Sequence, residues 1–214
     1  MAPRTLRIVS WVLDFAFIVA IGGAFFRQFT GSLLIFAAVF FAARLVRERA
    51  SSAWRQQRIR DQLAMLAAVL REDAADLRCT YHVPKRRPLA GHTELRQAFD
   101  YLPDGGGGGR CFPIDKGIIA KAYEHKAPKV ENFRDDADYH KRMMEEYNYT
   151  PSELRQRTAD RRSYLCIPLV DENHQVLGLV YLDSNTAGTF PRDDDNPRRR
   201  IVRAAAECLK AQMI

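Results

Sequence analysis

Two long apolar segments lie close together near the N-terminal end of this 214-residue chain. Residues 8–26 (IVSWVLDFAFIVAIGGAFF) carry one charged side chain, Asp14, and residues 29–46 (FTGSLLIFAAVFFAARLV) carry one, Arg44. At about 1.5 Å per helical residue, each segment approaches the thickness of the hydrocarbon layer of a bilayer. We therefore expect a transmembrane helical hairpin over residues 1–46.

Two other interpretations of these segments remain open. A cleaved signal peptide would explain the first run, but that run is long for one and a second run follows at once. A pair of helices buried in a soluble protein would explain both runs.

The positive charge of the chain is confined to the same region. The formal net charge is +7, and residues 1–60 hold nine arginines against two acidic residues, which accounts for all of it. Two arginines precede the first apolar segment, one lies in the turn, and six lie between residues 44 and 60. The positive-inside rule then predicts a two-pass protein of the plasma (inner) membrane with both termini cytoplasmic. Lipid, and not nucleic acid, is the expected partner of this charge.

Asp14 and Arg44 are predicted to form an ion pair inside the membrane. An acid at that depth costs about 2.5–3.5 kcal/mol on insertion scales. In an antiparallel hairpin that turns between Gln28 and Phe29, Asp14 lies level with Arg44. Such a pair would fix the register of the hairpin. The alternative is that Asp14 reaches the cytoplasmic surface.

The next segment predicts a long helix without Gly or Pro over residues 47–77. Residues 47–60 form its basic juxtamembrane part. From there an apolar stripe follows helical spacing, through Ile59, Leu63, Leu66, Leu70 and Leu77. The stripe fits either a helix lying on its own domain or a contact between two copies of the chain.

Residues 61–214 are balanced in charge and predict a separate α+β domain. Alternating apolar residues indicate strands, and the helical patterns lie between and after them. Strands are expected near 77–83, 95–101, 129–133, 163–170 and 175–184, and helices near 116–125, 134–161 with a break at Pro151, and 194–213. The last helix is expected to bury Ile201, Ala205, Cys208, Leu209 and Met213. This order predicts an antiparallel sheet with helices against one face.

The same region resembles a GAF domain. The resemblance rests on Gly117 and Ala122, on Ala127-Pro128 before a strand, on Pro168-Leu169, on Gly178 in the last hairpin, and on Phe190 before the closing helix. Pro168 inside a strand indicates an edge or a bulge. Gly178 indicates that another group approaches the sheet closely.

Motifs for catalysis and for metal binding are not found in the sequence. The run Gly105–Gly109 is followed by Arg-Cys-Phe and predicts a flexible loop, not a phosphate-binding loop. The cysteines (Cys79, Cys111, Cys166 and Cys208) and the five histidines lack metal-ligand spacing. We expect reduced thiols, mostly filling the core, with no metal, no cofactor and no enzymatic activity.

The resemblance implies a ligand pocket between the sheet and the helices after the third strand. Candidate binding residues are Phe112, Lys116, Arg134, Tyr139, Arg162, Tyr164 and Tyr181. Arginine and lysine would bind an anion, and the rings would stack on a base or fill apolar space, which suggests a small anionic or nucleotide-like ligand.

The leading hypothesis is a membrane-anchored, cytoplasmic sensory or regulatory protein that forms homodimers. No kinase, cyclase or DNA-binding segment follows the closing helix, so we expect a separate output protein. One alternative is a membrane effector whose hairpins assemble and perturb the bilayer. Another is a purely structural interaction module.

Overall fold

The computed structural model describes residues 14, 16–21, 30–87, 92–155 and 160–213, and the chain divides into two compact units, residues 1–56 and 57–214. In the first unit, residues 14 and 16–21 are helical and the helix α2 (Thr30–Arg71) begins. Arg44 Nη1 donates a hydrogen bond to Asp14 Oδ1, so the two residues form an ion pair, whose place inside a membrane stays a prediction. The Arg44 side chain is 30% exposed and the Asp14 side chain is 49% exposed.

Among the described residues, no helix is both long enough and apolar enough to cross a bilayer. Most of the first predicted membrane segment, residues 8–26, lies outside the described residues.

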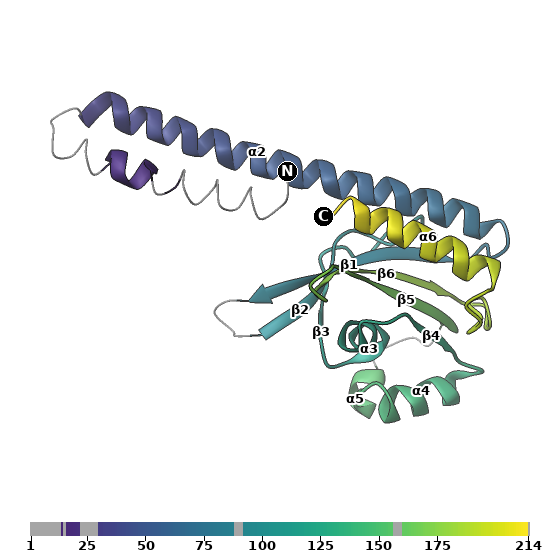
Figure 1. Ribbon diagram of the computed structural model, residues 1–214. Coiled ribbons are helices and arrows are strands. Elements are labelled where there is room, and N and C mark those ends of the chain that lie inside the picture. The colour runs from purple at the N-terminus through teal and green to yellow at the C-terminus, as the bar shows by residue number, and fades with distance from the viewer. Residues whose placement is uncertain (1–13, 15, 22–29, 88–91, 156–159, 214) are drawn as a thin grey trace. The chain divides into compact units, whose positions relative to one another are not determined.

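The second unit is built on a six-stranded antiparallel sheet (Figure 1). Its strands lie in the order β3-β2-β1-β6-β5-β4. They span β1 (Arg78–Arg87), β2 (His92–Gln97), β3 (Cys111–Pro113), β4 (Lys129–Asn132), β5 (Ser163–Val170) and β6 (Val176–Ser184). The α+β prediction is confirmed, but β3 was not foreseen because three residues after a glycine run carry no periodicity.

Four further helices follow the sequence signals closely. They are α3 (Gly117–His125), α4 (Asp136–Glu145), α5 (Pro151–Leu154) and α6 (Pro197–Ala211). Asp135 caps α4 by accepting from Asp138 N at 2.8 Å. Thr150 and Glu153 form a capping box before α5, whose first residue is Pro151. The break expected at Pro151 is therefore a helix start.

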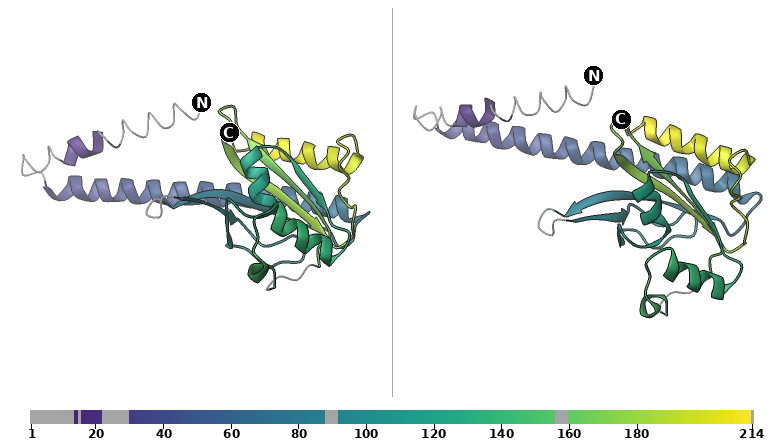
Figure 2. Two further views of the ribbon diagram at one scale, coloured as in Figure 1. Left: turned by 90° about the horizontal axis from the view of Figure 1, so that it is seen from below. Right: turned by 60° about the horizontal axis from the view of Figure 1, so that its bottom comes forward.

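Helices cover both faces of the sheet, and the prediction of one covered face was wrong (Figures 1 and 2). One core lies on the α2 and α6 side, and the other on the side of α3, α4 and α5. In β5, Leu165, Ile167 and Leu169 enter the first core, while Tyr164 and Cys166 enter the second. A strand apolar at nearly every position is typical of a sheet that is covered on both faces.

The predicted stripe of α2 packs on its own domain. Ile59, Leu63, Leu66 and Leu70 are at most 5% exposed and share a core with Leu209 of α6. The predicted face of α6 was correct in part. Leu209 is buried, and Ala205 and Met213 are partly buried against the same core, but Ile201 and Cys208 are exposed and Val202 and Ala206 are buried instead. The apolar residues of α6 spread over a wide arc of the helix surface, so their spacing does not show which residues lie at the centre of the buried face.

Two single-residue predictions on the sheet are confirmed. Pro168 lies beyond the last residue of β5 that pairs with β4, Cys166, and beside the irregularity at Leu169/Val170. A Cβ on Gly178 would lie 1.7 Å from the hydroxyl oxygen of Tyr81. The glycine therefore makes room for the Tyr81 ring.

Candidate functional site

A cavity of about 400 Å³ lies on the face of the sheet that α3 and α4 cover. The sheet contributes Arg78, Phe112, Tyr164, Tyr181 and Asp183. The start of α3, one side of α4 and the glycine-rich loop after β2 complete its walls. The volume is within the usual range for sites that bind small molecules.

A buried carboxylate organises two arginines at the cavity. Asp183, whose side chain is 1% exposed, accepts from Arg78 Nε at 2.7 Å and from Arg78 Nη2 at 3.2 Å. Arg161 Nε lies 3.5 Å from the same carboxylate, and Arg161 Nη1 donates to the carbonyl oxygen of Asp76 at 2.9 Å. The Arg78 guanidinium also lies 3.9 Å from the centre of the Tyr101 ring. Both guanidinium groups are therefore held in fixed positions beside the cavity.

Burial raises the pKa of the Asp183 carboxyl, and the hydrogen bonds from Arg78 limit that rise. Burial alone would lower the pKa of Arg78, but its hydrogen bonds to Asp183 and the charge of Asp183 raise it. Arg78 therefore stays cationic. Arg110 also lines the cavity, and within the described part of the chain no carboxylate lies at ion-pair distance from it.

The N-terminus of α3 opens into the same cavity. Lys116 occupies the capping position without a side-chain hydrogen bond to the helix, and Lys116, Gly117, Ile118 and Ile119 all line the cavity. The first N–H groups of a helix carry partial positive charge, which favours an anion nearby. Lys116 Nζ itself pairs with Glu153 at 2.7 Å.

Aromatic side chains line the interior of the cavity. Three of them are Tyr139, Tyr164 and Tyr181. Phe133 lies edge-on to two of these rings, and its ring centre is 5.1 Å from that of Tyr139 and 5.6 Å from that of Tyr164. Burial raises the pKa of Tyr164 and of Tyr181 well above the ordinary value. The phenols are therefore neutral near pH 7.

The glycine run forms a hydrogen-bonded wall of the cavity, and its predicted flexibility stays a prediction. Gly108 N donates to Asp100 Oδ1 at 2.8 Å, and Tyr101 N donates to Gly106 O at 2.9 Å. Four of the five glycines have positive φ angles between 80° and 92°, a conformation that glycine adopts without strain. Gly105 and Gly106 line the cavity.

The structure brings together five of the seven predicted binding residues. Those that line the cavity are Phe112, Lys116, Tyr139, Tyr164 and Tyr181. Sequence reasoning missed Arg78, Arg110, Arg161 and Asp183. Arg78 and Asp183 are directly opposite on neighbouring strands, but the pairing of the first strand with the last could not be read from local patterns.

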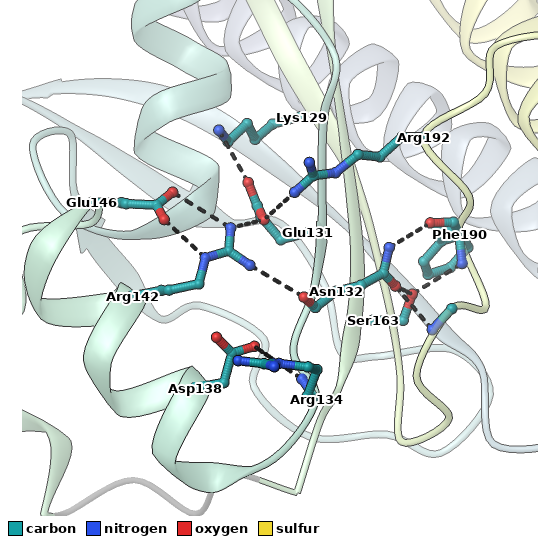
Figure 3. A network of polar contacts seen from close by, with 11 residues as sticks. Lys129, Glu131, Asn132, Arg134, Asp138, Arg142, Glu146, Ser163, Phe190 and Arg192 are labelled. Carbon is teal, nitrogen blue, oxygen red and sulfur yellow. Dashed lines mark hydrogen bonds and ion pairs between the residues drawn. The ribbon is translucent and has the colours of Figure 1, made fainter.

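The other two predicted residues, Arg134 and Arg162, do not line the cavity. Arg134 is 86% exposed and lies 3.9 Å from Asp138 (Figure 3). Arg162 Nη2 donates to Asp136 Oδ1. Both guanidinium groups therefore pair with acids in the first turn of α4. Successive side chains of an extended chain point to opposite sides, so Arg161, and not Arg162, lines the cavity.

Reactive groups are few around this cavity. All four cysteines are free, with Cys79 and Cys166 buried and Cys111 and Cys208 exposed. Core filling is therefore confirmed for two of them. Burial raises the pKa of Cys79 to about 12 and raises that of Cys166 as well. Within the described ranges, no group of three or more His, Cys, Asp or Glu side chains is placed to hold a metal ion. The guanidinium groups and the rings at the cavity are groups that can hold an anion with an apolar body.

Comparison with known proteins supports the fold. No family model and no curated protein sequence matches the chain. The GAF domain region of a protein from Geobacter sulfurreducens is similar in structure, with a TM-score of 0.52 and 18% identity over 78% of this chain and 97% of that one. The fold of the second unit is therefore GAF-like.

Two further solved structures are similar at lower scores. One is the GAF domain of a two-component sensor histidine kinase from Bacillus halodurans, with a TM-score of 0.48, 14% identity, and coverage of 72% of this chain and 91% of that one. The other is a type II free methionine-R-sulfoxide reductase from Thermoplasma acidophilum, with a TM-score of 0.48, 13% identity, and coverage of 74% and 94%.

Proposed function

We propose that this chain is a sensory or regulatory protein whose GAF-like domain binds a small organic anion in the cavity between the sheet and α3. The observation that carries the proposal is the charge around the cavity. Four cationic side chains line it, against two acidic ones. The cations are Arg78, Arg110, Lys116 and Arg161, and the acids are Asp160 and Asp183. Because Arg78 is paired with Asp183 and Lys116 with Glu153, the positive charge available to a ligand lies on Arg110 and Arg161.

The rings and the volume favour a ligand with a flat or apolar body. Tyr139, Tyr164, Tyr181 and Phe112 supply faces and edges on which such a body can pack. The start of α3, where the N-cap residue makes no side-chain hydrogen bond to the helix, also favours a negative group, although Gly117 N already donates to Tyr147 O at 3.0 Å. An aromatic or nucleotide-like acid satisfies both requirements.

The domain is proposed to bind its ligand without transforming it. Among the described residues, no cysteine and no histidine lines the cavity, so neither a thiol nor an imidazole is placed to attack the ligand. Burial raises the pKa of Tyr101, Tyr164 and Tyr181, so these phenols are neutral packing or hydrogen-bonding groups and not bases.

The N-terminal unit is proposed to attach the protein to the plasma (inner) membrane, with both termini cytoplasmic. The two apolar runs of residues 8–46 and the arginines that flank them support this proposal. The Asp14–Arg44 pair also supports it, because it joins residues 30 positions apart, as the register of an antiparallel hairpin requires.

Homodimers and a separate output protein complete the proposal. An apolar groove between α2 and α6 is lined by Met65, Leu66, Val69, Ile201 and Cys208, among others. Met65 is 70% exposed, Val69 51% and Ile201 41%. A second copy of the same two helices would cover this face.

Thermal unfolding of the purified full chain in the presence of small carboxylates, phosphates and nucleotides tests the binding function. Each acid is paired with its neutral amide or ester. We expect some acids to raise Tm while their neutral partners do not, and a ligand at 100 times its Kd to stabilise the fold by about 2.7 kcal/mol. A panel without any charge-dependent shift would contradict the proposal and favour a structural interaction module.

A further inference from the structure

A second groove, of about 650 Å³, lies along β4, an edge strand of the sheet. It is lined by Pro128 to Glu131 before and in β4, by Arg142 and Glu146 at the end of α4, and by Arg192, Asp194 and Arg199 before and in α6. None of these residues lines the ligand cavity. The groove is therefore a separate site.

One carboxylate in this groove is shared by three cations (Figure 3). Glu131, whose side chain is 3% exposed, accepts from Arg142 Nη2, and its oxygens lie 3.1 Å from Lys129 Nζ and 3.5 Å from Arg192 Nη2. Arg142 also donates to Glu146 at 2.8 Å and to the carbonyl oxygen of Asn132 at 3.1 Å. Arg142 is thus fully engaged, whereas Lys129 and Arg192 each retain free donors.

A second carboxylate is shared by two cations. Asp194 accepts from Arg199 Nη2 and lies 3.1 Å from Arg203 Nη2. Among the side chains that line the groove, four positive charges face three negative ones, an excess of one: Lys129, Arg142, Arg192 and Arg199 against Glu131, Glu146 and Asp194.

The cations differ in how they are held. Arg199 is 7% exposed and Arg142 is 17% exposed, so both are fixed in the wall. Arg192 is 71% exposed and Lys129 is 36% exposed, so their remaining N–H groups reach the open groove. Fixed charges behind and free donors in front are what an anion site requires.

We propose that this groove binds a phosphate group. The excess positive charge and the free donors of Lys129 and Arg192 favour a phosphate monoester, which carries close to two negative charges at pH 7. Guanidinium and ammonium groups together donate in several directions, which suits three phosphate oxygens better than the two of a carboxylate. An occupant contacts β4, the end of α4 and the segment before α6 at once. The phosphate is either free in solution or part of a lipid headgroup, and the experiment separates the two.

The test is isothermal titration of the full chain with inorganic phosphate and with pyrophosphate at constant ionic strength. We expect saturable binding in the wild type, and binding at least about tenfold weaker in Lys129→Gln and in Arg192→Gln. Arg192 is largely exposed, so its replacement leaves the fold intact. Arg200→Gln is the matched control, because Arg200 is an exposed arginine of α6 that does not line the groove, and it should bind as the wild type does.

A parallel arm uses vesicles of phosphatidylcholine with and without phosphatidic acid. Binding of the soluble anions alone assigns the site to a free phosphate. Binding of phosphatidic acid vesicles that Arg192→Gln weakens, without binding of the soluble anions, assigns it to a lipid headgroup. Absence of both, or binding that Lys129→Gln and Arg192→Gln leave unchanged, overturns the proposal.

Discussion

Arg78 and Asp183 face each other across β1 and β6 and form a two-pronged ion pair beside the ligand cavity. The carboxylate is almost fully buried, so it serves as a fixed anchor for the guanidinium and, at 3.5 Å, for Arg161. Removing only the carboxylate would leave two partly buried cations without their partner. The pair is thus part of the cavity wall as well as of the sheet.

Replacement of Gly178 by alanine tests the close approach of Tyr81. The added methyl group would overlap the phenol of Tyr81, which is 1% exposed and has little room to move. We expect Gly178→Ala to lower the free energy of unfolding by about 1–3 kcal/mol in urea titrations. In a Tyr81→Leu background the same change should cost less. Equal stability of Gly178→Ala and wild type would show that the ring is not held there.

His82 is predicted to make the fold sensitive to mild acid. It is fully buried against Phe112 and Tyr181, and in the described structure neither ring nitrogen has a hydrogen-bond partner. Burial lowers its pKa to about 3. Between that value and the ordinary pKa near 6.5, the unfolded chain binds a proton that the folded chain does not, so stability falls as the pH falls.

The measurement compares wild type with His82→Leu at pH 7 and pH 5. The loss of unfolding free energy on acidification should be smaller in the variant by about 2 kcal/mol. Buried or paired carboxylates affect both proteins alike and cancel in the comparison. Identical losses in the two proteins would mean that His82 takes up its proton in the folded state.

Neighbouring residues of α2 are expected to respond differently to a carboxylate. Leu66 is 5% exposed and Met65 is 70% exposed. Leu66→Asp should unfold the second unit, because an unpaired charge would enter the core. Met65→Asp should keep the fold, measured by circular dichroism, and dissociate the proposed dimer, measured by sedimentation. A folded Leu66→Asp, or a dimer unaffected by Met65→Asp, would contradict the corresponding assignment.

Asp14 and Arg44 should be coupled energetically. We expect the effects of Asp14→Ala and Arg44→Ala on the stability of the full chain to be non-additive, with the double variant less destabilised than the sum of the two, by about 0.5–3 kcal/mol. Additive effects would show that the ion pair contributes nothing to the fold of the first unit.

Local patterns predicted most of the second unit, because strands with alternating or continuous apolar residues and capped helices carry their signal within a few residues. Ser163–Val170 was predicted with the bounds that the structure has. Long-range pairing was not accessible in this way. Arg78 and Arg161 meet Asp183 because β1 lies beside β6 in the sheet. Both faces of the sheet are covered because α2 and α6, which are far apart in the sequence, pack together on one of them.

The sequence predicted the aromatic residues of the cavity better than its charged residues. The side chain of a residue on a strand points to one of only two faces of the sheet, so Tyr164 and Tyr181 could be predicted to line the cavity. The arginines were misplaced because a one-residue change along an extended segment reverses the side on which a side chain lies. Arg161 lies at the cavity and Arg162 binds Asp136.

That neighbouring pair of arginines also gives the most direct test of anion binding. The measurement is the Kd of an acidic ligand of the full chain, determined by calorimetry for wild type, Arg161→Gln and Arg162→Gln, with Arg110→Gln as a variant at an exposed cavity residue. The account predicts that Arg161→Gln and Arg110→Gln each weaken binding about tenfold or more, which is about 1.4 kcal/mol, while Arg162→Gln binds as the wild type does. Equal weakening by Arg161→Gln and Arg162→Gln, or none by Arg161→Gln and Arg110→Gln, would contradict the assignment of the cavity as the anion site.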